Sequence, residues 1–136
     1  MESYALKGGN NPSRFTPEGW YTVTPRIVAH DPERLVGFLK QVFGATGDYR
    51  SDMPSVMVIG DSRVMVSNAG VHDPMPAFLY VYVDDCDKTY GRALQCGASS
   101  LEEPTDTPYG DRRSMVNDRW GNTWQIATCM DERDAG

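Results

Sequence analysis

Two stretches of the chain place apolar residues at the spacing of an α-helix. The first begins at Asp31-Pro32, with Asp31 as the expected N-cap and Pro32 as the first helical residue, and it ends at Gly44. The second opens at residues 85–87 and ends at Gly97. The apolar stripes consist of Leu35, Phe38, Leu39, Val42 and Phe43 in the first stretch, and Cys86, Tyr90, Ala93 and Leu94 in the second. Each stripe predicts an amphipathic helix that packs against a core.

The rest of the pattern is typical of short strands separated by turn residues. Strand-forming residues dominate 20–29, 46–50, 54–59 and 63–67 around the first helix, and 77–83, 99–103, 112–117 and 123–129 around the second. Pro25 predicts an edge or a bulge in the first strand, and residues 103–110 predict a loop.

This order of elements predicts an α+β fold built from two β-α-β-β-β modules, at about 20–68 and 77–130. A linker rich in Gly, Pro and Asp joins them. We expect a single domain over 20–136, preceded by a flexible tail at 1–19.

One pair of similar motifs does not follow the repeat of the modules. Residues 60–66 and 110–116 share the pattern Gly-Asp-x-Arg-x-Met-Val, yet they occupy different places in the predicted order of strands. We therefore interpret this match as chance. We instead treat residues 64–66 as the equivalent of residues 124–126, because both belong to the last strand of their module.

Composition narrows the classes of function. The chain has 136 residues and a net charge of −6, which argues against a general nucleic-acid binder, since such a protein needs a basic face. No apolar run approaches the roughly 18 residues of a membrane span, so no membrane partner is expected. An odd number of cysteines at irregular spacing, without an apolar leader, indicates a reduced, cytoplasmic protein.

Alternation along the strands distinguishes a possible pocket wall from a helix-covered face. In the strand at 77–83, Phe78, Tyr80 and Tyr82 share one face, while Leu79, Val81 and Val83 share the other. The aliphatic face suits packing beneath a helix. The aromatic face suits either a core or a pocket wall that stacks a ligand and hydrogen-bonds it.

Several segments together resemble one family. They are Thr24 to Pro32, Val42 to Ala45, Tyr82 to Asp85, and the stretch Asp118-x-x-Gly121-Asn122-x-Trp124-Gln125-Ile126. This combination resembles the vicinal oxygen chelate superfamily of glyoxalases, bleomycin-resistance proteins and dioxygenases, and its Thr-Pro opening is most similar to the PhnB-like branch. The resemblance implies a curved eight-stranded mixed sheet around a cavity, with the helices on the convex side.

The same resemblance also implies four positions at which metal-using members bind a divalent ion. In this chain they are Thr24, Met65, Phe78 and Gln125, and only Gln125 carries a side chain suited to a hard or borderline cation. His30 and His72 share no strand or helix face and are interpreted as surface residues. We therefore expect no metal, no other cofactor and no catalytic residue.

The sequence favours a metal-independent protein that binds and sequesters a small molecule, such as an antibiotic or another bulky aromatic natural product, and that forms a homodimer. The alternative is a metal-independent lyase, isomerase or hydrolase acting on a small carbonyl compound. A third possibility is a dimer with a vestigial cavity.

Arg26 faces either an anionic ligand or a carboxylate, and Trp120 is expected to be exposed at a hairpin turn. The predicted ligand-binding residues are Trp20, Thr24, Arg26, Met65, Phe78, Tyr80, Tyr82, Trp120 and Gln125.

Overall fold

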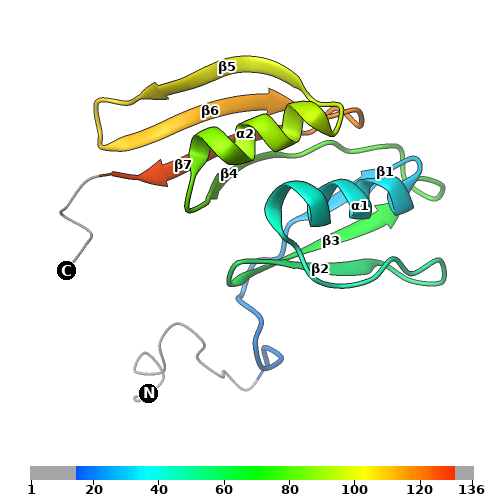
Figure 1. The fold of residues 1–136 in the computed structure, drawn as a ribbon. Helices are drawn as coiled ribbons and strands as arrows, with labels where there is room; N and C mark the ends of the chain where they lie inside the picture. Colours follow the sequence, from blue (N-terminus) through cyan, green and yellow to red (C-terminus); the bar gives the residue numbers. More distant parts are fainter. Residues whose placement is uncertain (1–14, 131–136) are drawn as a thin grey trace.

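The computed structural model describes residues 15–130, so most of the predicted tail lies outside the described residues. Within them the chain forms two helices and seven strands (Figure 1). Their order is β1 (Arg26–Ala29), α1 (Pro32–Phe43), β2 (Ser55–Ile59), β3 (Ser62–Asn68), β4 (Phe78–Tyr82), α2 (Cys86–Gln95), β5 (Ser99–Asp106), β6 (Asp111–Asn117) and β7 (Thr123–Cys129). Neither helix is long and apolar enough to cross a membrane.

The two halves of the chain share one topology. The first sheet has the order β1-β3-β2 and the second has the order β4-β7-β6-β5. In each sheet the first strand pairs in parallel with the last strand of its module, β1 with β3 and β4 with β7. Strands β3 and β7 therefore occupy equivalent places, which agrees with pairing residues 64–66 with 124–126 rather than with 114–116.

The expected continuous sheet of eight strands is not observed. The described residues form two separate sheets, of three and four strands. The predicted strand at 46–50 is reduced to a single bridge, in which Thr46 and Val58 exchange backbone hydrogen bonds of 3.0 and 2.9 Å. Gly47 directly follows Thr46 and has φ 122°, a conformation that leaves the β region and prevents the ladder from continuing.

Two further boundaries differ from the prediction for local reasons. Strand β1 begins only at Arg26, after Pro25, although Pro25 still accepts a hydrogen bond from the backbone N–H of Met65. Strand β5 continues through Pro104, where a loop was expected. This proline is tolerated because β5 is an edge strand whose pairing with β6 shifts register between Glu102 and Thr105.

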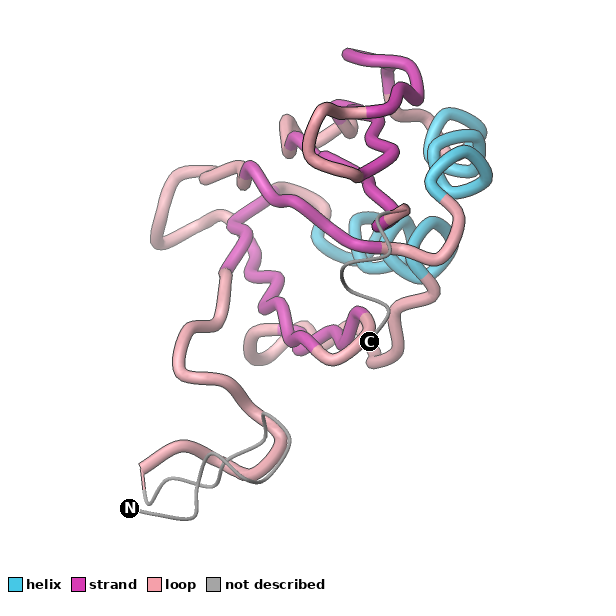
Figure 2. The backbone as a smooth tube through the Cα atoms, turned by 90° about the vertical axis from the view of Figure 1, so that its left-hand side faces the viewer, coloured by secondary structure: helices cyan, strands magenta, loops and turns pink. Residues whose placement is uncertain are grey.

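The helices lie side by side, and each covers one face of its own sheet. Figure 1 shows the layers in the order second sheet, α2, α1 and first sheet, and Figure 2 shows the two helices next to each other. Both modules contribute to one hydrophobic core. The rings of Phe43 at the end of α1 and Trp124 on β7 are 5.0 Å apart and link the two modules. We call the face of each sheet that points away from its helix the open face.

A charged side chain strengthens the junction between the helices. Arg92 of α2 donates two hydrogen bonds, of 3.3 and 3.1 Å, to the carbonyl oxygen of Val42 in the last turn of α1. The last carbonyls of a helix lack partners within the helix, and they carry the negative end of its dipole. The guanidinium therefore satisfies a carbonyl of one module from the helix of the other.

The hairpin between β6 and β7 is held by the buried carboxylate of Asp118. Its two oxygens accept four N–H bonds of 2.8 to 2.9 Å, from the backbone of Trp120 and Asn122, the side-chain amide of Asn122 and the indole of Trp124. Trp120 is half-buried rather than exposed, because its ring packs against Phe38 of α1 with the centroids 5.9 Å apart.

Removing this carboxylate is expected to be costly. The Asp118→Ala variant leaves several buried N–H groups without an acceptor, so the free energy of unfolding should fall by about 3 kcal/mol. Urea denaturation measures the loss. The matched control is Asp48→Ala, which removes an exposed carboxylate that forms a 3.5 Å ion pair with Lys40. This control should change stability by less than about 0.5 kcal/mol. Equal effects of the two substitutions would contradict the role of Asp118.

Candidate functional site

The open face of the second sheet carries a row of aromatic side chains. On β4, Phe78, Tyr80 and Tyr82 alternate with Leu79 and Val81, and the two aliphatic residues pack against the hydrophobic core. Phe78 is 66% exposed and Tyr82 is 61% exposed. The division of β4 into an aliphatic and an aromatic face was predictable from the alternation.

Strands β6 and β7 add polar residues to the same face. Gln125 lies beside Tyr80 in the β4–β7 register and beside Met115 in the β6–β7 register. Four residues further along β7, Cys129 is opposite Asp111. Cross-strand partners point to the same side of a sheet, so the register places these four residues beside the aromatic row.

Asp111 lies beneath the two tyrosines. It is 2% exposed, and its Oδ2 atom accepts hydrogen bonds from the hydroxyls of Tyr80 at 2.6 Å and Tyr82 at 2.9 Å. Its backbone is fixed by Thr107, whose hydroxyl accepts from the Asp111 N–H at 3.0 Å. The other carboxylate oxygen, Oδ1, is buried and has no hydrogen-bond partner within the described part of the chain. Such an atom is unusual in a folded protein and calls for an explanation.

An ion pair continues this network toward β5. Arg113 donates to both carboxylate oxygens of Glu102, at 2.9 and 3.1 Å, and to the hydroxyl of Tyr109 at 2.9 Å. The Tyr109 hydroxyl in turn lies 3.4 Å from the hydroxyl of Tyr80. The hydrogen bonds to Glu102 raise the pKa of Arg113, so the guanidinium stays charged. Arg113 is therefore fully engaged by Glu102 and Tyr109.

The environment keeps both tyrosines of the row protonated. Burial, followed by the hydrogen bond to Asp111, raises the pKa of Tyr80 far above its ordinary value. For Tyr82 the hydrogen bond to Asp111 is the larger cause and burial the smaller. In both cases the nearby carboxylate disfavours a second negative charge. At neutral pH the site therefore presents two neutral phenols hydrogen-bonded to one carboxylate.

The open face of the first sheet is different in character. Arg26 on β1 is exposed, and its guanidinium donates to the sulfur of its cross-strand neighbour Met65 at 3.4 Å. Nearby, the guanidinium of Arg63 lies 5.2 Å from the centre of the Trp20 ring, a cation–π contact. The side chain of Arg26 thus meets a thioether within residues 15–130, rather than the carboxylate or anion considered from the sequence.

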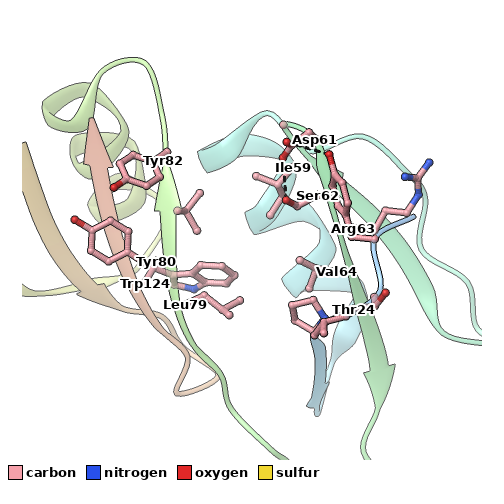
Figure 3. Close-up of a pocket in the computed structure, with 15 residues that line it drawn as sticks. Thr24, Ile59, Asp61, Ser62, Arg63, Val64, Leu79, Tyr80, Tyr82 and Trp124 are labelled. Atoms are coloured by element: carbon pink, nitrogen blue, oxygen red, sulfur yellow. Dashed lines mark hydrogen bonds between the residues drawn. The ribbon is translucent and has the colours of Figure 1, made fainter. Parts of the chain in front are cut away.

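A pocket of about 390 Å³ opens between the two modules (Figure 3). In Figure 3, Leu79 and Trp124 point from the second module toward Val64 of the first, while the rings of Tyr80 and Tyr82 point away from the first module. The pocket is also lined by residues 59–63, Tyr80, Val81 and Tyr82, together with Tyr21, Val23, Thr24 and Pro25. Residues from both faces of β4 therefore line this pocket.

The structure divides the nine predicted ligand-binding residues into separate groups. The second open face holds Phe78, Tyr80, Tyr82 and Gln125, and the first open face holds Arg26 and Met65. Thr24 lines the pocket between the modules, Trp20 contacts Arg63, and Trp120 lies against α1. Three of the nine, Thr24, Tyr80 and Tyr82, also line the pocket between the modules.

Sequence reasoning missed the residues that complete the aromatic site. Asp111 and Arg113 belong to the motif at 110–116 that we interpreted as a chance repeat, and Glu102 and Tyr109 were assigned to a surface strand and a loop. Strand alternation could have placed Asp111, Arg113 and Met115 on one face. The hairpin of β6 and β7 was expected, but the parallel pairing of β4 with β7, which brings that face to the tyrosines, was not readable from the sequence.

The four positions implied for a metal do not form a suitable set of ligands. Met65 and Phe78 lie on open faces of different sheets, and the Met65 sulfur already accepts a hydrogen bond from Arg26. Across residues 15–130, no three His, Cys, Asp or Glu side chains converge as a metal site requires. The residues present at these positions therefore do not fit a divalent ion.

Comparison with known proteins identifies the family. The model of the glyoxalase/bleomycin resistance protein/dioxygenase superfamily matches residues 21–126, and the chain belongs to this superfamily. Uncharacterized proteins of Mycobacterium bovis and Mycobacterium tuberculosis are 29% identical to it over 93 residues, which is 68% of this chain. The chain covers 58% and 52% of the length of these two relatives.

Solved structures share the fold. TioX from a Micromonospora species superposes with a TM-score of 0.68 at 24% identity, covering 79% of this chain and 97% of TioX. A glyoxalase/bleomycin resistance protein/dioxygenase family enzyme from Burkholderia phytofirmans gives a TM-score of 0.67 at 21% identity, covering 78% and 96%. These likenesses support the two-module α+β architecture.

The raised pKa of Tyr80 predicts a specific alkaline behaviour. The folded protein holds this proton more tightly than the unfolded chain, so the stabilisation is complete below the ordinary pKa of 10.0 and is lost as the pH rises through the folded value. Near-ultraviolet absorbance of phenolate should show one fewer late-ionising tyrosine in Tyr80→Phe than in the wild type, while Tyr82, whose pKa is also raised, still ionises late. Tyr90→Phe is the control, because the Tyr90 hydroxyl bonds Ser100 and not a carboxylate. An unchanged number of late-ionising tyrosines in Tyr80→Phe would refute the assignment.

Proposed function

We propose that this protein binds a small aromatic molecule on the open face of its second sheet and sequesters it without a metal ion. The observation that carries the proposal is the row of Phe78, Tyr80 and Tyr82, whose outer two rings remain more than half exposed. Aromatic side chains gathered on an exposed sheet face favour ligand or partner contacts, since each buries a large area when covered.

The neighbouring polar groups suit recognition of a small molecule. Gln125 and the hydroxyls of Tyr80 and Tyr82 provide hydrogen-bonding groups next to the rings, and Met115 provides an adaptable apolar surface. A few fixed polar groups within an apolar wall are characteristic of ligand sites. Binding by stacking and hydrogen bonding requires no metal, and Gln125 alone does not supply the several converging donors that a cation needs.

A homodimer is part of this proposal. The layer order of one chain points the two open faces away from each other, so the Arg26 and Met65 face does not enclose the tyrosine row of the same chain. A second copy that places its first module beside the tyrosine row provides the missing wall. Sedimentation velocity of the purified protein tests this part of the proposal, and a monomer at all concentrations would contradict it.

The alternative of a metal-independent enzyme acting on a small carbonyl compound is less well supported. The raised pKa of Tyr80 makes its phenol a weak acid at neutral pH, and the Asp111 carboxylate is already engaged by two hydroxyls. Incubation with bound compounds followed by mass spectrometry separates the two functions. Recovery of intact ligand favours the binder, whereas turnover that depends on Tyr80 or Asp111 favours the enzyme.

The aromatic row can be tested by truncation. Phe78→Ala and Tyr82→Ala should each weaken binding of planar aromatic natural products by about 1 kcal/mol, or roughly fivefold, because each removes a stacking surface. Ligand-observed NMR on a panel of such compounds measures the change. Phe15→Ala is the control, since Phe15 is an 85% exposed aromatic residue outside this face. Failure of every compound in the panel to bind would overturn the proposed function.

Metal loading provides an independent check. Protein incubated with zinc, nickel or manganese and then washed should retain far less than one ion per chain, because no converging set of donors is present in residues 15–130. Elemental analysis of the washed protein measures retention. One ion per chain that disappears in Gln125→Ala would contradict metal independence.

A further inference from the structure

Two buried aspartates near the ends of β6 have very different surroundings. Asp118 is 4% exposed and its two oxygens share four N–H donors. Asp111 is 2% exposed, but it receives only two hydroxyl bonds, both on Oδ2, and Oδ1 has none. Asp118 therefore has the full set of partners of a structural carboxylate, whereas Asp111 does not.

Among residues 15–130, the charge of Asp111 is also unbalanced. The cation closest in the network is Arg113, which is engaged by Glu102 and Tyr109. Arg113 and Glu102 cancel, so the group of Glu102, Arg113 and Asp111 keeps one negative charge. A buried carboxylate with neither a cation nor a full set of hydrogen bonds is expensive. A cation supplied from outside the chain would remove that cost.

The directions of the hydrogen bonds define what such a cation meets. Tyr80 and Tyr82 each use their single hydroxyl hydrogen to donate to Asp111. The hydroxyl of Tyr109 must then be the donor in its 3.4 Å contact with Tyr80. The tyrosine oxygens above Asp111 are thus left with lone pairs only, and they accept hydrogen bonds from a ligand but donate none.

The aromatic rings add a second attraction for positive charge. The rings of Tyr80 and Tyr82 are 5.3 Å apart and tilted by 58°, and Phe78 lies on the same face of β4. The face of an aromatic ring carries negative potential, so a cation over Phe or Tyr is stabilised. Aromatic faces and hydrogen-bond acceptors therefore meet at one place, directly over an uncompensated carboxylate.

We propose that the ligand of this face carries a protonated amine, and that its ammonium group binds over Tyr80 and Tyr82 with Asp111 as counter-ion. This inference rests on the proposed function and adds the chemical class of the ligand. Tyr82 is 61% exposed and is not part of the core, so its ring can turn outward. This movement lets an N–H of the ammonium reach Oδ1 of Asp111. The bound ammonium then replaces the Tyr82 hydroxyl as a donor to the carboxylate.

The test compares two probes of nearly the same shape. The first is 2-naphthylmethylamine, which is protonated at neutral pH, and the second is the neutral alcohol 2-naphthylmethanol. NMR titration of the full chain should give at least tenfold tighter binding of the amine. Asp111→Asn should remove most of that preference and leave binding of the alcohol within about twofold, since both probes stack equally well.

Two further variants make the test sharper. Tyr82→Phe keeps the exposed ring and removes the hydroxyl that the ammonium has to displace from Asp111. Binding of the amine should therefore be at least as tight as in the wild type, and binding of the alcohol should be unchanged. Asp106→Asn removes an 80% exposed carboxylate paired with Arg112, and it should leave the preference intact. This control separates the effect of Asp111 from that of net charge. Thermal unfolding of each variant confirms that it is folded.

Each outcome has a definite meaning. Equal binding of both probes by the wild type overturns the ammonium assignment but leaves the proposed aromatic site standing. Absence of binding for both probes overturns the two proposals together. If Asp111→Asn instead changes the sedimentation coefficient, the cation is a side chain of a second copy of the chain, and the ammonium assignment is wrong.

Discussion

The carboxylate of Asp118 determines how the two modules meet. It gathers the backbone of the turn and the indole N–H of Trp124 into one set of hydrogen bonds. That bond orients the Trp124 ring toward the interior, where it contacts Phe43 of the other module. Because successive residues of a strand point to opposite sides, the same bond also turns Gln125 to the open face. The core of the fold and the edge of the site are thus fixed by one buried side chain.

The two faces of the second sheet carry different kinds of side chain. The helix-side face is packed with large buried side chains such as Trp124 and Ile126, and the indole N–H of Trp124 is hydrogen-bonded to Asp118. The open face holds tyrosines, a glutamine and the ion pair of Arg113 with Glu102. Rigid packing on one side holds polar groups of the other side in place, since both faces share the same backbone.

Much of the fold was readable from local patterns. The spacing of apolar residues predicted both helices, and strand alternation placed Tyr80 and Tyr82 on one face. The side chain of Asp85 caps α2 by accepting a 3.1 Å bond from the N–H of Lys88. Asp31 occupies the predicted cap position of α1 but adopts φ 58° and makes no side-chain cap. Propensity does not reveal such details, because a left-handed residue depends on how the chain enters the helix.

The parts that could not be predicted depend on long-range pairing. The predicted strand at 46–50 is not formed beyond Thr46. The conformation of Gly47 is set by its close approach to β2 rather than by its neighbours in sequence. The role of Asp111 depends on β4, β6 and β7 coming together, which brings residues about 30 positions apart into hydrogen-bond contact. The two Gly-Asp-x-Arg motifs look alike, yet Asp61 is exposed and accepts a 3.3 Å bond from Tyr21, whereas Asp111 is buried beneath Tyr80 and Tyr82.

The separation of the packed and open faces has an evolutionary consequence. Substitutions at Phe78 or Tyr82 alter exposed side chains and leave the shared core of the modules untouched. If this face binds a ligand as proposed, mutations on it change ligand preference with little loss of stability, and a duplicated gene can diverge without losing the fold. Asp111 is the exception, because a change there affects both the hydrogen bonds of two tyrosines and a buried charge. Divergence in ligand choice should accordingly proceed first through the aromatic rim and only later through the carboxylate beneath it.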